Sequence, residues 1–100
     1  MQIVIKKQVN ILSLMRQCGY YISKNNNNEI AFFRIISNSK SGFPRFHAYI
    51  KKDEISQETI INLHLDQKKP VYKGSSAHAA EYEGELVEKE TERLSQILNQ

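Results

Sequence analysis

The chain has 100 residues, of which 40% are hydrophobic and 25% charged, and its net charge is +3 at neutral pH. This composition is typical of one soluble globular domain and excludes a disordered chain. Apolar runs are far shorter than the roughly 20 residues that span a bilayer. The first ten residues also lack the order of a signal peptide. We therefore expect a single domain over residues 1–100, cytoplasmic and without membrane contact.

Charge is unevenly distributed along the chain. Residues 1–52 contain nine Lys and Arg residues and one acidic residue, a net charge of +8. Residues 53–100 contain five Lys and Arg residues and ten acidic residues, a net charge of −5. A basic half attracts phosphate groups, and complementary halves favour self-association. Dispersed, solvated surface charge is the alternative. The single cysteine, Cys18, excludes an internal disulfide and a cysteine-based zinc site.

The first predicted element is a helix over residues 9–19, VNILSLMRQCG. Ile11 and Met15 fall on one apolar stripe, and Gly19 stands where a helix commonly ends. Residues 3–5, IVI, either extend this helix or form a short strand, and the pattern leaves both open.

Four stretches rich in β-branched and aromatic residues predict strands: residues 20–22, 29–37, 43–52 and 59–67. Turns are expected between them at residues 23–28, 38–42 and 53–58. The first of these turns contains four consecutive asparagines, which tolerate left-handed backbone.

A long final helix is predicted over residues 77–99, after an irregular connection at residues 68–76, KKPVYKGSS. Ser76 is the expected N-cap. The apolar stripe of this helix is Ala80, Val87, Leu94 and Leu98. Gly84 lies near that stripe, where it would let the helix approach a sheet closely.

The order α-β-β-β-β-α, or α-β-β-β-α without the shortest strand, predicts an α+β fold. We expect a two-layer sandwich in which an antiparallel sheet of three or four strands carries the N-terminal helix and the long C-terminal helix on one face. The other face is left to solvent or to a ligand.

Alternation along the last two strands indicates which side chains line that open face. One side of the two strands carries the apolar residues Phe46, Ala48, Ile50, Ile61, Leu63 and Leu65. The other side carries Arg45, His47, Tyr49, Asn62, His64 and Asp66. If Arg45 lies opposite His64, the apolar residues of both strands share one face of the sheet and the polar residues share the other. From the strand at residues 29–37, Arg34 is expected to join the polar face with Phe32 beside it.

Arginine, histidine, tyrosine and asparagine bind ligands through bidentate hydrogen bonds, stacking and proton exchange near neutral pH. The predicted catalytic acids and bases are His47, His64 and His78. The predicted ligand-binding residues are Arg34, Arg45, Tyr49, Asn62, Asp66, Tyr72, Lys73, Ser75 and Ser76. The last three of these and His78 would form an anion cradle at the start of the final helix, for which a flexible turn with an N-cap is the alternative.

The function predicted from this pattern is binding of RNA or of another phosphate-containing ligand, with metal-independent phosphodiester cleavage as the candidate reaction and no cofactor. Whether the protein is an enzyme stays open. One alternative is a homo-dimer or larger homo-oligomer that acts as an interaction module without catalysis. Another is a metal-binding protein that uses His47, His64 and Asp66. A half-solvated face with incidental histidines is the remaining alternative.

The stretch LMRQCGYY, followed by a predicted β-hairpin, resembles the start of the HicA-type toxins, which are small RNA-cleaving proteins. That resemblance implies a double-stranded-RNA-binding-like α-β-β-β-α fold and covers only a short N-terminal part of the chain. The Gly-Ser-His motif of that family is missing after the first turn. Its catalytic histidine therefore has no counterpart here.

Overall fold

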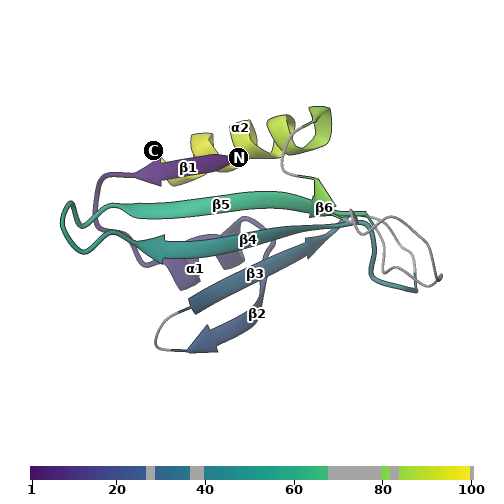
Figure 1. The fold of residues 1–100 in the computed structure, drawn as a ribbon, viewed down its shortest axis with the longest axis horizontal. Helices are drawn as coiled ribbons and strands as arrows, with labels where there is room; N and C mark the ends of the chain where they lie inside the picture. The colour runs from purple at the N-terminus through teal and green to yellow at the C-terminus, as the bar shows by residue number, and fades with distance from the viewer. Residues whose placement is uncertain (27–28, 37–39, 68–79, 82–83, 100) are drawn as a thin grey trace.

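The structure is a computed structural model that describes residues 1–26, 29–36, 40–67, 80–81 and 84–99. Its elements in chain order are β1 (Gln2–Ile5), α1 (Ile11–Gln17), β2 (Tyr21–Asn26), β3 (Glu29–Ile35), β4 (Arg45–Lys52), β5 (Thr59–Asp66), β6 (Ala80–Glu81) and α2 (Glu85–Leu98) (Figure 1). The predicted α+β class is confirmed. The sheet, however, has more strands than expected, and a strand precedes the first helix.

The six strands form one antiparallel sheet in the order β1-β5-β4-β3-β2, with β6 paired to β5. One edge of β5 pairs with β4 along its whole length. The opposite edge is shared by β1, which pairs with residues 59–62, and β6, which pairs with Leu65 and Asp66. Strands β5, β4 and β3 therefore each have neighbours on both edges, and strand pairing restrains the side chains that they carry.

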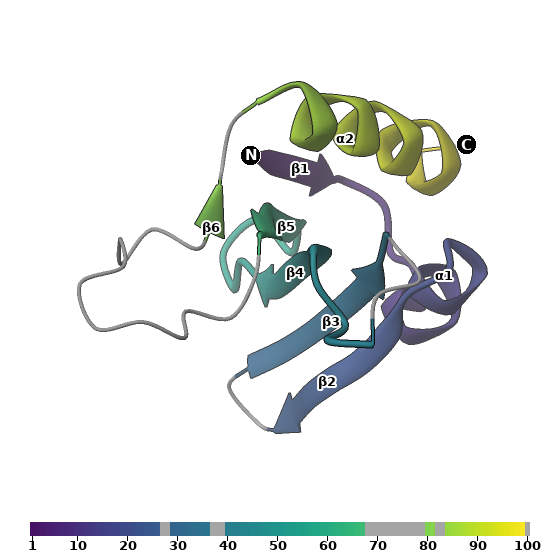
Figure 2. The same ribbon diagram turned by 90° about the vertical axis from the view of Figure 1, so that its right-hand side faces the viewer.

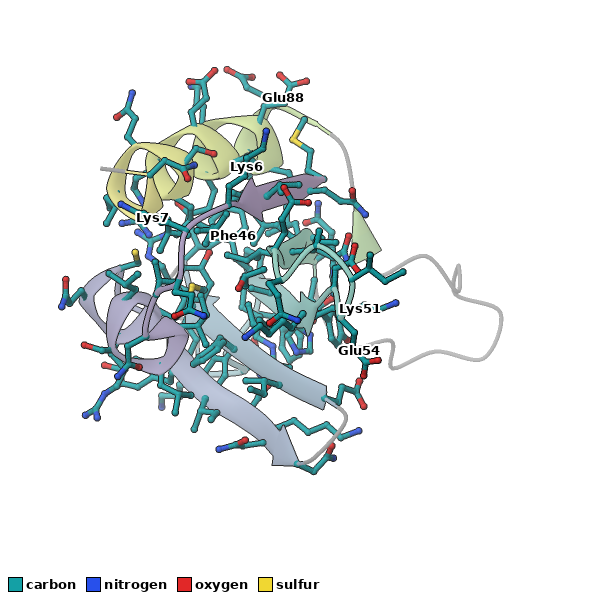
Figure 3. All side chains as sticks on the ribbon, turned by 90° about the vertical axis from the view of Figure 1, so that its left-hand side faces the viewer. Lys6, Lys7, Phe46, Lys51, Glu54 and Glu88 are labelled. Carbon is teal, nitrogen blue, oxygen red and sulfur yellow. The ribbon has the colours of Figure 1, made fainter. Side chains whose placement is uncertain are left out.

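Both helices pack on the same face of the sheet (Figure 2). One buried cluster joins Met15 of α1, Cys18 at its C-cap, Val87 and Leu94 of α2, and apolar side chains of four strands. In Figure 3, Phe46 lies in this interior, whereas Glu88 on the outer side of α2 points away from the sheet. The opposite face of the sheet is not covered by either helix. In the part of the chain that the structure describes, neither helix is long and apolar enough to cross a membrane.

Helix α1 lies within the predicted range of residues 9–19 and ends before the predicted glycine, but it begins two residues later than predicted, after an N-cap that was not predicted. The side chain of Asn10 accepts a hydrogen bond from the backbone N–H of Ser13 at 3.1 Å and so caps the N-terminus. Gly19 follows the C-cap with φ +93°, a conformation that glycine adopts without the steric cost of a Cβ. The chain then enters β2 at once.

Residues 3–5 belong to a strand. Ile3 and Ile5 are buried while Gln2 and Val4 are exposed, which is the period-two pattern of a half-buried strand. The turn expected over residues 23–28 is wrong in part, because β2 continues to Asn26. Backbone pairing with β3 holds these polar residues in the sheet.

The final helix is shorter than predicted, and its expected start at Ser76 is wrong. Residues 80–81 form β6, so Ala80 does not belong to the helical stripe, and α2 begins only after Gly84. Gly84 has φ +126°, which residues with a Cβ rarely adopt. It therefore marks the start of the helix and not a close contact within it. Val87, Leu94 and Leu98 are buried as the stripe predicts.

The strands β4 and β5 have the predicted faces but not the predicted register. Arg45 pairs with Asp66, His47 with His64, and Tyr49 with Asn62, two residues away from the expected partners. The connecting loop explains this shift, because Lys52 already pairs with Thr59 and the loop closes with hydrogen bonds between Asp53 and Glu58 and between Gln57 and Asp53. A shift of two preserves the alternation, so each face keeps its residues.

The predicted position of Arg34 and Phe32 on the open face is wrong. Phe32 is 1% exposed and lies opposite Ala48 in the core, and Arg34 lies opposite Phe46 on the helix side. The alternate side chain, Phe33, faces the open side opposite His47. Both parities of β3 are apolar, so alternation could not distinguish them. Arg34 forms an ion pair with a buried carboxylate on α2, and this pair offsets the cost of placing the arginine charge beside the core.

Candidate functional site

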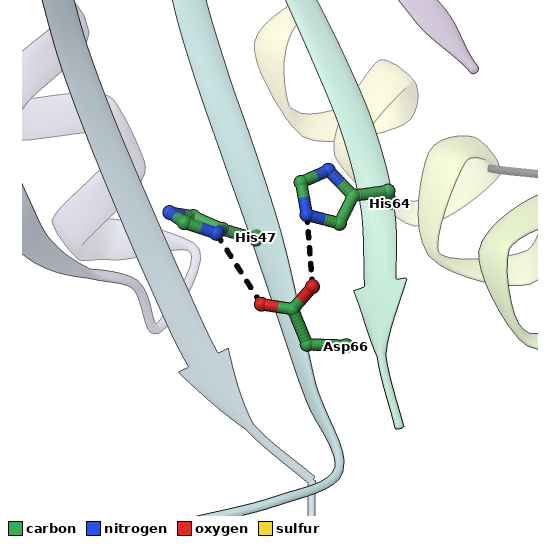
Figure 4. Close-up of side chains that lie close together, drawn as sticks. All are labelled: His47, His64 and Asp66. Atoms are coloured by element: carbon green, nitrogen blue, oxygen red, sulfur yellow. Dashed lines mark ion pairs between the residues drawn. The ribbon is translucent and has the colours of Figure 1, made fainter. Parts of the chain in front are cut away.

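A carboxylate joins two imidazoles on the open face of the sheet (Figure 4). Asp66 Oδ1 lies 2.9 Å from Nε2 of His64, and Asp66 Oδ2 lies 3.4 Å from Nδ1 of His47. All three side chains point toward a common centre. A potential metal-ligand atom from each of the three residues lies within 4.8 Å of the others.

Sheet geometry brings these groups together. His47 on β4 and His64 on β5 are directly paired, so their side chains rise from the same face at adjacent strands. Asp66 is two residues beyond His64, which places it on the same face about 6.5–7 Å further along the strand. The three residues thus come from a protected part of the sheet, where strand pairing restrains all of them.

The cluster is partly sheltered from water by neighbouring rings. The ring of Tyr49 lies 4.5 Å from that of His47 and stacks on that of His64 at 5.2 Å, and the two imidazoles are 5.1 Å apart. Side-chain exposure is 4% for His64, 16% for His47 and 19% for Asp66. His64 is therefore buried, with the ring of Tyr49 stacked on it, whereas His47 and Asp66 keep part of their side-chain surface exposed.

Two further side chains support the cluster from outside. Ser23 Oγ lies 3.4 Å from Nε2 of His47, the ring nitrogen that does not face Asp66. Arg45 Nε lies 3.8 Å from Asp66 Oδ2. The guanidinium of Arg45 also lies over two rings, 5.2 Å from the centroid of Phe33 and 4.5 Å from that of Phe43. These contacts restrict the orientation of one imidazole and of the carboxylate.

Burial determines the charge state of the two histidines. Loss of hydration lowers the pKa of His47 and the pKa of His64 below the ordinary value, and the nearby Asp66 carboxylate offsets only part of this effect. Both imidazoles are therefore neutral at neutral pH, and each offers a nitrogen lone pair to a proton or a metal.

A row of four aromatic rings crosses the open face. Tyr21 on β2 pairs with Phe33 on β3, Phe33 pairs with His47 on β4, and His47 pairs with His64 on β5. We call these four residues the aromatic row. The rings of Tyr21 and Phe33 are 6.0 Å apart, and Tyr21 is 68% exposed. Neither is among the predicted site residues, because both parities of β3 are apolar and the strand predicted at residues 20–22 is too short to show which tyrosine faces outward.

The structure brings together half of the predicted site residues. Arg45, His47, Tyr49, Asn62, His64 and Asp66 share the open face. Arg34 lies on the other face of the sheet. The remaining predicted site residues, Tyr72, Lys73, Ser75, Ser76 and His78, lie outside the described residues.

A second polar cluster, on the helix side, was not predicted. Glu90 of α2 is 4% exposed and accepts hydrogen bonds from Tyr20 at 2.6 Å, from Arg93 at 2.7 and 2.9 Å, and from Arg34 at 3.4 Å. Arg93 also donates to the backbone oxygen of Cys18 at 2.8 Å. We call Tyr20, Arg34, Glu90 and Arg93 the Glu90 cluster. A glutamate between Val87 and Leu94 on the apolar stripe was the sequence signal for it.

Comparisons of the chain with family models, with curated proteins and with solved structures found no match.

Proposed function

We propose that the open face of the sheet binds single-stranded RNA. The observation that carries this proposal is the aromatic row, in which four neighbouring strands each contribute one ring to the same face. A sheet that presents aromatic rings in this way can stack successive unpaired bases. Stacking depends little on sequence because every base has a π-face.

The accessible end of the row is the part that meets a base first. Tyr21 is 68% exposed and lies beside Phe33, which is half-buried. Toward β5 the row becomes more buried, and the half-buried His47 is its last accessible ring. A strand of RNA lying across β2, β3 and β4 would therefore find stacking partners of decreasing exposure.

Arg45 is the residue that we expect to bind phosphate, and its guanidinium lies 5.2 Å from the centroid of the Phe33 ring in this row. Arginine binds phosphate through a planar fork of donors and stacks on aromatic faces at the same time. The excess of basic residues in positions 1–52 supports the attraction of a polyanion. The predicted cleavage of the bound strand, the predicted homo-dimer and the predicted cytoplasmic location stay predictions.

The test is fluorescence anisotropy with a short, mixed-sequence labelled RNA, single-stranded or annealed to its complement. Tyr21→Ala is expected to weaken binding of the single strand roughly 5- to 150-fold, the equivalent of about 1–3 kcal/mol for one stacked base. Arg45→Gln should weaken binding and reduce the salt dependence by about one phosphate contact. Gel analysis of the same samples reports whether the RNA is cleaved.

Two variants serve as matched controls. Ile55→Ala removes an apolar side chain that is 96% exposed on the β4–β5 loop, and Arg16→Gln removes a positive charge from α1 on the helix side. Both should bind RNA like the unaltered protein. Equal affinity of Tyr21→Ala and Ile55→Ala, or no salt-sensitive binding by the unaltered protein at low salt, would refute the proposal.

A further inference from the structure

We propose that His47, His64 and Asp66 bind one divalent transition-metal ion of the zinc class. This site is distinct from the proposed RNA-binding function, because its ligand is a metal ion and its test needs no nucleic acid.

The distances fit a single ion. With metal–nitrogen and metal–oxygen bonds of about 2.0–2.2 Å, two ligands of a tetrahedral ion lie about 3.3–3.5 Å apart. His47 Nδ1 and Asp66 Oδ2 already have this separation, 3.4 Å. His64 Nε2 and Asp66 Oδ1 are at hydrogen-bond distance, 2.9 Å, and have to move apart by only a few tenths of an ångström when the ion replaces the shared proton. The three ligand atoms all lie within 4.8 Å of one another, so the longest separation has to shorten by no more than about 1.3–1.5 Å to reach the tetrahedral spacing. Rotation of the side chains can supply this change while the strands stay paired.

The donor set selects the class of ion. Two imidazole nitrogens and one carboxylate oxygen suit Zn²⁺, Co²⁺ and Fe²⁺, whereas Mg²⁺ and Ca²⁺ prefer oxygen ligands alone. Three protein ligands leave a coordination position for water or for a ligand oxygen, as catalytic zinc sites do. That position would lie on the side of His47 and Asp66, whose side chains are 16% and 19% exposed, because the side chain of His64 is only 4% exposed.

Outer contacts hold the ligands in this orientation. Ser23 Oγ lies 3.4 Å from Nε2 of His47, so it can accept that N–H while Nδ1 coordinates the ion. A partner at the second nitrogen is the usual companion of a metal-bound histidine. Ser23 stands at the register shift between Ile22 and Lys24, a β-bulge, and bulges commonly redirect a side chain beside functional sites.

Arg45 is a charged group beside the cluster, with its Nε 3.8 Å from Asp66 Oδ2. Its positive charge opposes that of the ion, so binding depends on the carboxylate and on both imidazoles together. The same guanidinium is placed to pair with an anionic ligand that occupies the open position, for example a phosphate oxygen.

The experiment uses the full chain, freed of metal with a chelator and then dialysed. Calorimetric titration with Zn²⁺ should give one site per chain. Titration with Co²⁺ should produce the strong visible absorption of a low-coordinate ion with nitrogen ligands. His47→Ala and Asp66→Asn are each expected to weaken Zn²⁺ binding about 100-fold or more. Ser23→Ala should weaken it about 10-fold through the orientation of His47.

Glu54→Gln is the matched control, because it removes an exposed carboxylate on the β4–β5 loop and should leave Zn²⁺ affinity unchanged. Circular dichroism of each variant checks that the fold is retained, and Ser23→Ala tests the site without removing a ligand. Binding that is absent in the unaltered protein, or equally strong in His47→Ala, Asp66→Asn and Ser23→Ala, would overturn the proposal.

The two proposals can fail separately. Tyr21→Ala should lose RNA affinity and keep Zn²⁺ affinity, since its ring makes no contact with the three ligands among the described residues. A protein that binds Zn²⁺ with the expected variant pattern but no RNA would refute only the proposed function.

Discussion

The two faces of the sheet each carry a carboxylate with several partners, and the partners differ in kind. On the helix side, Glu90 meets a phenol and two guanidiniums. On the open side, Asp66 meets two imidazoles, with a guanidinium further away at 3.8 Å. Arginine and the tyrosine hydroxyl act here as hydrogen-bond donors to the carboxylate and offer no nitrogen lone pair to a metal ion. A neutral imidazole, in contrast, has a nitrogen lone pair that can accept a proton or bind a metal.

This difference separates a structural cluster from a chemically available one. The Glu90 cluster ties α2 to β3 and to the chain after α1, and its oxygens are fully engaged beneath the helix. The Asp66 cluster lies on the face that neither helix covers, where a ligand can reach it. A buried carboxylate thus indicates function only when its partners can exchange protons or bind a metal.

The largest expected effect follows from removing the centre of the helix-side cluster. Glu90→Ala leaves two arginines and a tyrosine hydroxyl without their shared acceptor next to the core, so it should lower the free energy of unfolding by about 3–5 kcal/mol. Urea unfolding followed by circular dichroism measures this change.

Glu92→Ala provides the matched control, because it removes an exposed glutamate from the same helix and should change stability by less than about 0.5 kcal/mol. Similar losses for the two variants would mean that the Glu90 cluster does not hold α2 in place.

An intermediate effect is expected from Tyr20→Phe, which deletes only the hydroxyl that donates to Glu90 at 2.6 Å. A hydrogen bond to a charged group contributes about 1.5–3 kcal/mol, and the remaining arginine contacts keep Glu90 partnered. Burial and the bond to Glu90 raise the pKa of Tyr20, so its ring should also resist ionisation in an alkaline ultraviolet titration. A loss of stability as large as that of Glu90→Ala would contradict this order.

The smallest of the three effects concerns the open side. The pKa values of His47 and His64 are lowered in the folded protein, mainly by burial, so the unfolded chain binds protons first as the pH falls. Metal-free protein should therefore be most stable above the ordinary histidine pKa of about 6.5 and lose stability between that pH and the lowered folded values. Urea unfolding at a series of pH values in chelator tests this.

His47→Gln should reduce the slope of stability against pH in that window, because, of these two histidines, His64 alone would then contribute. The Glu92→Ala control should keep the full slope. A stability that rises as the pH falls through the window would mean that Asp66 outweighs burial at these two imidazoles.

Local patterns predicted much of the fold. The alternation in residues 45–51 and 59–66 placed His47, His64 and Asp66 on one face, and the structure has them there. The glycine end of α1 was equally predictable from neighbouring residues. These features depend on side-chain period and backbone preference, which the sequence displays directly.

Other features were not readable because several arrangements satisfied the same pattern. A shift of two residues between β4 and β5 keeps both faces intact, so alternation could not choose the pairing of His47 with His64. Residues 80–81 have a helix-compatible composition, yet they pair with the edge of β5. Glu90 interrupts an apolar stripe, but the residues around it do not indicate that Tyr20, 70 residues earlier in the chain, donates a hydrogen bond to it.

The amino-acid sequence alone determined the α+β class, the apolar and polar faces of β4 and β5, and the outward direction of both imidazoles, because these follow from the spacing of neighbouring residues. Only the tertiary structure decided the register that brings His47, His64 and Asp66 within reach of one another, the face of β3 that adds Phe33 to the aromatic row, and the partners of Glu90. Each of these rests on contacts between distant segments, whose energy appears only when the whole sheet and both helices are assembled.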